Sequence, residues 1–280
     1  MKTEWDYTNL ADAYLKRPDY AQEAIDKMLS IAGVYEGDMV CDVGAGVAHL
    51  TLMLAAKGLD VTAVEPNDAM RANGIKRTEN MKNVQWFEGV GEHTGQPDEK
   101  FKLVTFGSSF NVCNRQEALQ EAHRILVDDG WFACMWNHRD LNDSIQRNIE
   151  EIIKSHIDGY SYGTRREDQT EVIKESGLFD NIQAFSGNVT HSVNVKDVVE
   201  AWKSHGTVER QAKDKFDAII KDIEEYVYGL KVNEIEIPYV TRVWMAKSCK
   251  SGMGGGKTRL TKRINRKLPS FIEYDRKEAC

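Results

Sequence analysis

The 280-residue sequence is short of cysteine and of long apolar runs. Its five cysteines are scattered, odd in number and never spaced as CxxC, which argues against a disulfide framework and predicts no metal site. No apolar run approaches the roughly 20 residues that span a bilayer. The first residues, Met1 to Asp6, contain no apolar h-region, so we expect no signal peptide and a cytoplasmic protein.

The charge is acidic overall but unevenly spread. The net charge is −7. The segment from Lys250 to Cys280 has nine basic and three acidic residues, a net +6, so the rest of the chain carries −13. An acidic body argues against a broad nucleic-acid surface. The basic end could contact an anionic partner or be a solvated extension. Ser251–Thr258 is close to a P-loop but starts with serine, which favours a glycine linker.

Short apolar segments alternate with helical periodicity through the first half of the chain. Strands are predicted at 39–43, 61–65, 84–87, 103–106 and 131–136, with a turn at 128–130. Such alternation indicates βαβ units, a parallel sheet and helices on both faces. Ligands of these sheets bind beyond the carboxyl ends of the strands, where the strand order reverses.

The second half is predominantly helical. Helices are predicted at 144–157, 168–176, 195–204 and 209–228, and strands at 179–186 and 234–246. The predicted fold class is α/β: a doubly wound, mostly parallel seven-stranded sheet with an inserted helical lid. The predicted parts are a helical cap (1–35), a ligand-binding core (36–143), an insertion (144–233) with one core strand near 179–186, a final strand (234–248) and a glycine-linked basic tail (249–280). Whether the insertion covers the ligand or only adds packing is left open.

A glycine loop follows the first strand. Gly44 and Gly46 stand where a strand becomes a helix, and glycine lets the backbone approach a ligand closely. The third glycine of the dinucleotide fingerprint G-x-G-x-x-G would fall on His49, so that fingerprint fails. Asp42 suits the cationic amino-acid end of S-adenosylmethionine (SAM), and Glu65 could accept both ribose hydroxyls.

Three segments carry a family resemblance. Residues 41–50 (CDVGAGVAHL), 64–70 (VEPNDAM) and 118–140 resemble the motifs of class I SAM-dependent methyltransferases, which implies a Rossmann-like methyltransferase fold. Tyr14-x-x-Arg17-Pro18-x-Tyr20 and Trp136-Asn137-x-Arg139-Asp140 resemble the small-molecule branch with trans-aconitate-type enzymes. The resemblance covers about residues 7–247. It departs at Ala48, where the family has a third glycine. The Asn/Asp-Pro-Pro-Tyr signature of adenine-N6 nucleic-acid enzymes is absent.

The resemblance implies a set of site residues. Those implied for SAM are Tyr14, Arg17, Asp42, Gly44, Ala45, Gly46, Glu65, Pro66, Met70, Val90, Gly91, Glu92, Gly107 and Ser108. Those implied for the methyl acceptor are Asn111, Asn137 and Arg139. His138 and His93 follow predicted strand ends and are the candidate bases; a surface or core role remains open for each.

These residues predict transfer of a methyl group from SAM to an oxygen or nitrogen of a small metabolite, which is acidic or sugar-like, with release of S-adenosylhomocysteine (SAH). A biosynthetic role and a homodimer are compatible with the sequence. Two other functions remain open: an NAD-dependent oxidoreductase and a non-catalytic SAM-binding interaction protein.

Overall fold

The computed structural model describes Thr8, residues 11–203 and residues 205–250. The predicted tail beyond Lys250, with its glycine linker, lies outside the described residues. The strands are β1 (Met39–Val43), β2 (Asp60–Val64), β3 (Val84–Phe87), β4 (Phe101–Gly107), β5 (Leu126–Arg139), β6 (Phe179–Asn194) and β7 (Glu234–Ser248). The α-helices are α1 (Ala11–Tyr14), α2 (Gln22–Ala32), α3 (His49–Ala55), α4 (Asp68–Arg77), α5 (Arg115–Ile125), α6 (Ser144–His156), α7 (Thr170–Glu175), α8 (Val195–Lys203), α9 (Gly206–Ala212) and α10 (Phe216–Gly229). Short 3-10 turns are η2 (Phe110–Val112), η3 (Gly163–Arg166) and η4 (Lys213–Lys215).

The seven strands form one mixed sheet in the order β3-β2-β1-β4-β5-β7-β6. The pairs from β3 through to β5 are parallel, whereas β7 runs antiparallel to both β5 and β6. The strand order reverses between β1 and β4, so the carboxyl ends of these two strands border the crevice where such sheets bind ligands.

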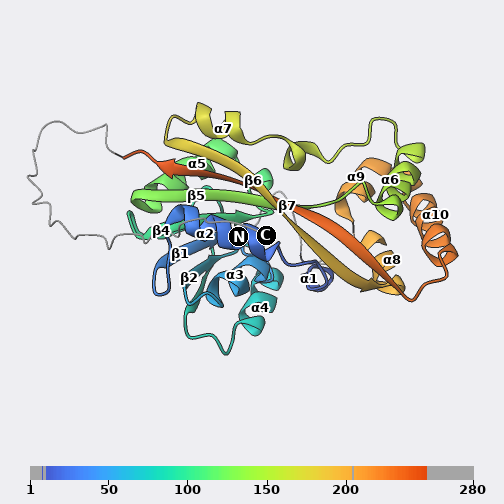
Figure 1. Cartoon of the computed structure of the whole chain (residues 1–280), viewed down its shortest axis with the longest axis horizontal. Coiled ribbons are helices and arrows are strands. Elements are labelled where there is room, and N and C mark those ends of the chain that lie inside the picture. The colour runs from blue at the N-terminus through green and yellow to red at the C-terminus, as the bar shows by residue number, and fades with distance from the viewer. Residues whose placement is uncertain (1–7, 9–10, 204, 251–280) are drawn as a thin grey trace, which may run out of the picture. The chain divides into compact units, whose positions relative to one another are not determined.

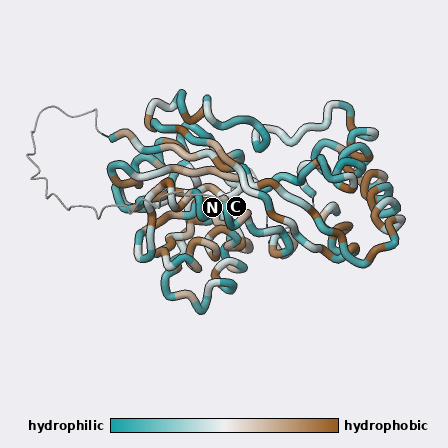
Figure 2. The backbone as a smooth tube through the Cα atoms, viewed as in Figure 1, coloured by the Kyte–Doolittle hydropathy of each residue, from teal (hydrophilic) through white to brown (hydrophobic). Residues whose placement is uncertain are grey.

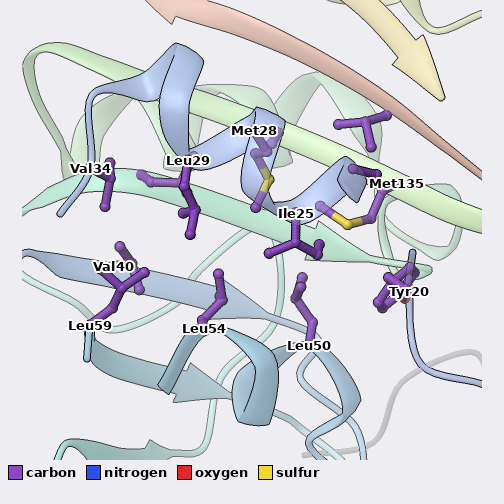
Figure 3. Close-up of a cluster of buried hydrophobic side chains, with 14 of the residues drawn as sticks. Tyr20, Ile25, Met28, Leu29, Val34, Val40, Leu50, Leu54, Leu59 and Met135 are labelled. Atoms are coloured by element: carbon purple, nitrogen blue, oxygen red, sulfur yellow. The ribbon is translucent and has the colours of Figure 1, made fainter. Parts of the chain in front are cut away.

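Helices cover both faces of the sheet. Along β1, Val40 packs toward α2 and α3, whereas Cys41 and Val43 belong to a second cluster with α5 on the opposite face. Figure 3 shows Ile25 and Met28 of α2 and Leu54 of α3 around Val40. Alternate residues of a strand point to opposite faces. The two cores therefore hold the carboxyl ends of the strands between rigid layers.

Two predicted strand boundaries were wrong. The strand predicted at 179–186 continues to Asn194, and its second half pairs with β7 from Gly187–Thr241 to Asn194–Glu234. This half is mostly polar and partly exposed, so it carries no apolar run to predict it. The turn predicted at 128–130 lies within β5, where the register against β4 shifts and Asp129 has φ of 63°.

The second half of β6 and the first half of β7 carry the helical insertion (Figure 1). Helices α6, α8, α9 and α10 pack with these strands around an apolar core of their own, coloured brown in Figure 2. The helix predicted at 209–228 divides into α9 and α10, because Lys213 has φ of 53° and interrupts it. Among the described residues, no helix is both long and apolar enough to cross a membrane.

Candidate functional site

A cavity of about 820 Å³ lies at the carboxyl ends of β1, β2, β4 and β5. Its lining comes from the segment around α1, from the loops that follow these strands, and from η3, α8 and α9 of the insertion. All the residues predicted for SAM and for the acceptor line it, and the two candidate histidine bases do not.

The glycine loop after β1 forms one wall. The backbone N–H groups of Gly44 and Ala45 donate to the carbonyl of Val64, at 2.8 and 3.1 Å, which ties the loop to the end of β2. Gly44 has φ of 69°, and a Cβ built on it would lie 2.4 Å from the Cβ of Ser109. Both the conformation and the space therefore require glycine at this position.

Glu65 links the glycine loop to the loop after β2. One carboxylate oxygen accepts the N–H of Gly46 and the other accepts that of Asn67, both at 2.9 Å. Arg71 donates to the backbone carbonyl of Glu65 at 2.7 Å. Burial raises the pKa of this carboxyl group, against the lowering effect of the two backbone donors. Pro66 and Met70 continue the same wall.

Asp42 lies deeper, at the floor of the cavity. Its two carboxylate oxygens accept hydrogen bonds from Thr51 of α3 and Thr105 of β4, at 2.7 and 3.0 Å. Burial raises its pKa to about 6. The side chain thus joins helix to sheet beneath the glycine loop while it contributes to the lining.

The loop after β3 supplies Val90, Gly91 and Glu92 to the lining. A Cβ on Gly91 would lie 2.4 Å from the sulfur of Cys113, so a side chain there would displace the neighbouring wall. Glu92 accepts the backbone N–H of Asn114 at 2.5 Å. This contact holds the loop against the start of α5.

The end of β4 is strained at the cavity. Ser108 has φ of 60°, a left-handed conformation that costs energy in a residue other than glycine. Its hydroxyl lies 3.0 Å from that of Tyr20. A Cβ on Gly107 would approach the Tyr20 hydroxyl to 2.9 Å. The close packing of Tyr20 holds this turn in place.

The two asparagines predicted to bind the acceptor are engaged by the protein. Asn111 accepts from the indole of Trp136 at 2.9 Å. Asn137 donates to the carbonyl of Asp19 at 2.9 Å and accepts from Thr241 at 2.5 Å. Both line the cavity, and these hydrogen bonds hold them in its wall.

The segment around α1 closes one side of the cavity. The guanidinium of Arg17 stacks over the ring of Tyr14 at 3.6 Å, a cation–π contact. His49, which was predicted only as a departure from a fingerprint, anchors this segment. Its Nδ1 lies 2.7 Å from the carboxylate of Asp19, and its Nε2 lies 2.8 Å from the carbonyl of Tyr14.

The structure does not bring the two candidate bases to the cavity. His93 is exposed on the loop after β3. His138 is buried on β5, between the lining residues Asn137 and Arg139, and neither ring nitrogen has a hydrogen-bond partner. Burial, followed by the charges of Arg165 and other arginines, lowers the pKa of His138 to about 3. Because alternate strand residues point to opposite faces, its neighbours reach the cavity and it does not.

The sequence predicted an inserted helical lid but did not identify which of its residues line the cavity. Tyr162, Arg165, Arg166 and His205 all line the cavity. His205 is buried, stacks on Trp202 with ring centroids 4.9 Å apart, and accepts the backbone N–H of Val208 through Nδ1 at 3.4 Å. No short motif marks these residues, since they come from separate helices and turns. In the part of the chain that the structure describes, no cluster of three or more His, Cys, Asp or Glu could hold a metal ion.

Comparison with known proteins identifies the core. Residues 41–134 match the family model described as a methyltransferase domain. An uncharacterized methyltransferase of Mycobacterium tuberculosis is 32% identical over 137 residues, which cover 49% of this chain and 54% of that protein. The ubiquinone/menaquinone biosynthesis C-methyltransferase UbiE of Zymomonas mobilis is 28% identical over 161 residues, covering 52% of this chain and 63% of that protein. The chain therefore spans little more than half the length of these relatives.

Solved structures agree with the fold. A putative type II methyltransferase from Anaeromyxobacter dehalogenans superposes with a TM-score of 0.60 at 13% identity, covering 82% of this chain and 97% of that one. The Haemonchus contortus phosphoethanolamine N-methyltransferase 2, solved with phosphomonomethylethanolamine and SAH, gives 0.51 at 13% identity, covering 85% and 56%. The family match shows a methyltransferase domain over residues 41–134, and the solved structures agree with an α/β, Rossmann-like fold.

Proposed function

We propose that this chain is a SAM-dependent methyltransferase that transfers a methyl group to an oxygen or nitrogen of a small metabolite. One observation carries the proposal. The glycine loop after β1 is bonded to the carboxylate that ends β2, through Gly46 and Glu65, at the border of a cavity large enough for a cofactor and an acceptor. The methyltransferase domain match covers the same strands.

The lining fits SAM. Gly44 and Gly46 present backbone where a side chain would fill the cavity wall. Each Glu65 oxygen accepts one backbone N–H, and a carboxylate offers about four acceptor positions, so acceptance from both ribose hydroxyls remains available. When bound, SAM supplies a methyl group that its sulfonium has already activated. The protein's task is to align an acceptor atom with it.

The acceptor end of the cavity favours an acidic metabolite. Arg139 stands at the end of β5 and stacks over Trp202 at 4.3 Å. Arg17 also lines the cavity, in the segment that we assign to closing over the cofactor with Tyr14. An acceptor oxyanion needs no general base. This agrees with a site from which both His138 and His93 are absent. A sugar-like acceptor remains compatible with the asparagines of the wall.

We further propose that the insertion acts as a lid. α8 and α9 line the cavity and pack in the separate core of the insertion. Movement of these helices would therefore open or close the acceptor end. The cysteines in the described residues are free, and Cys41 and Cys134 are buried in the sheet core. Free thiols support a reducing, cytoplasmic location.

Calorimetric titration with SAH tests the proposal, with NAD as the control ligand. We expect micromolar binding of SAH and none of NAD, followed by SAH release in an acceptor screen. Binding of NAD in place of SAH would indicate an oxidoreductase. Binding of SAH without turnover on any acidic or sugar-like acceptor would indicate a non-catalytic binding protein.

A further inference from the structure

Two arginines that no motif assigns face the cavity from the connection between α6 and α7. Arg165 and Arg166 lie in η3, on the stretch that crosses from the insertion back to the sheet in Figure 1. Arg139, at the end of β5, lines the same cavity. Three guanidinium groups from two distant parts of the sequence therefore converge on its acceptor end.

Within the described part of the chain, these charges have no acidic ion-pair partner. No carboxylate of the described residues lies within ion-pair distance of Arg139, Arg165 or Arg166, whose Nε atoms are buried without hydrogen-bond partners. The nearest acids in sequence are engaged elsewhere. Glu167 pairs with Arg115 at 3.7 Å, and Asp168 accepts from Thr170 and Trp244.

Aromatic rings hold the arginines instead. Arg166 stacks over Tyr162 at 3.6 Å, and the Tyr162 hydroxyl donates to the buried carboxylate of Glu150. Arg139 stacks over Trp202. Stacking fixes a guanidinium in position and leaves its edge N–H groups available to a ligand.

The cluster is electrostatically costly in the protein alone. Burial, followed by the charge of Arg17 and by those of the other cavity arginines, lowers the pKa of Arg165 to about 10. Like charges gathered in a partly buried site destabilise the fold unless an anion compensates for them. Arginine forks match the geometry of carboxylate and phosphate oxygens. A ligand anion would therefore relieve a cost that the fold otherwise carries.

We propose that Arg165 and Arg166 bind an anionic group of the methyl acceptor, a carboxylate or a phosphate, that is distinct from the atom receiving the methyl group. This inference rests on the proposed function. On this proposal η3 determines which acceptor binds. The glycine loop and Glu65 bind the cofactor, and the arginine pair selects metabolites with a second charged group. Neutral analogues of the acceptor lose this contact.

Thermal unfolding of the full chain in the presence of anion probes tests the proposal. The probes are citrate and pyrophosphate, each compared with sodium chloride at equal ionic strength, with and without SAH. We expect at least one probe to raise Tm beyond the salt control in the wild type. The double variant Arg165→Gln/Arg166→Gln should lose that shift, with an affinity for the probe weaker by about tenfold or more. The control Arg147→Gln removes an exposed arginine of α6 outside the cavity and should keep it.

The outcomes separate the two proposals. Equal Tm in the probes and in salt would overturn the anion site, as would a shift that the double variant retains. A double variant that loses SAH binding would place these arginines on the cofactor and also overturn it. A wild-type chain that shows the anion shift but binds no SAH would refute the methyltransferase proposal instead. Because the double variant removes like charges, we expect its Tm without ligands to equal or exceed that of the wild type, so misfolding does not obscure the result.

Discussion

Glu65 combines a structural role with the cofactor role that we propose for it. Its carboxylate accepts two backbone N–H groups from two loops, and the residue lines the cavity. Sequence reasoning could find it, because an acidic residue at the end of the second strand is a local pattern. The same reasoning could not foresee that each carboxylate oxygen already accepts a backbone N–H group, since that depends on how two loops meet.

We predict that Glu65→Ala weakens SAH affinity by about tenfold or more, because a charge-assisted contact to the ligand and the tie between loops are both lost. Calorimetric titration measures it. Glu65→Gln, which can still accept hydrogen bonds, should retain part of the affinity. An unchanged dissociation constant in Glu65→Ala would contradict the assignment of this residue to the cofactor.

The second prediction concerns His138 and the pH dependence of stability. Its folded-state pKa of about 3 lies below its ordinary value of 6.5. As the pH falls below about 6.5, His138 becomes protonated in the unfolded chain but stays neutral in the folded chain. The free energy of unfolding therefore falls between about pH 6.5 and pH 3. From pH 7 to pH 5 this residue alone costs about 2 kcal/mol.

The variant His138→Leu removes the imidazole that takes up this proton in the unfolded chain. Urea unfolding at pH 7 and pH 5 should therefore show a smaller loss of stability in His138→Leu than in the wild type. Equal losses would mean that the imidazole is protonated in the folded chain. Turnover at pH 7 in the same variant also tests the original choice of His138 as base, which its position away from the cavity does not support.

At the level of elements, α3 and α4 together hold the short segment around α1. The two ring nitrogens of His49 in α3 lie against Asp19 and the carbonyl of Tyr14, and Asn73 of α4 donates to Asp12 at 3.1 Å. α1 has four residues, too few to be stable in isolation. Sequence analysis expected a helical cap here but gave no reason for it to stay in place.

We predict that His49→Ala releases this segment and weakens SAH affinity by about threefold to tenfold, which corresponds to one or two ordinary hydrogen bonds. Titration calorimetry on the full chain measures the change. The matched control is His156→Ala, which removes a histidine–aspartate contact of the same 2.7 Å length, with Asp222, outside the cavity. If both variants bind SAH as the wild type does, the His49 contacts are not needed for cofactor binding.

The elements also show which parts of the fold were predictable. β1, β2 and the glycine loop are local in sequence, and apolar runs followed by glycine identify them. The second half of β6 is polar and depends on its ladder with β7, which pairs residues from Asn194–Glu234 to Gly187–Thr241, 40 to 54 positions apart in sequence. No local pattern records such a pairing. The lining from Tyr162 to Arg166 and at His205 has the same origin, since only the folded insertion brings these residues together.

At the scale of the whole described chain, three large apolar cores and one small cluster around Ala11 of α1 stabilise the fold. Two of the large cores lie on the faces of the sheet, and the third lies within the insertion, on the second half of β6 and the first half of β7. The cavity lies where sheet and insertion meet. We infer that the sheet determines cofactor affinity, and that the insertion determines the shape of the acceptor end.

This separation predicts different effects for matched core substitutions. Ile223, on α10, is fully buried in the insertion core, and Leu54, on α3, is fully buried in a sheet core. Either residue changed to alanine should cost about 2–5 kcal/mol. In Ile223→Ala, amide hydrogen exchange should rise in α8 and α10 but not in β1, because local opening follows the core that is weakened. Leu54→Ala should show the reverse pattern, with faster exchange in β1 and α3.

Ile223→Ala should also raise the KM for the acceptor more than the dissociation constant for SAH. Uniformly faster exchange in both variants would show that sheet and insertion unfold as one cooperative unit, in which case the insertion could not move as a lid without opening the cofactor site as well.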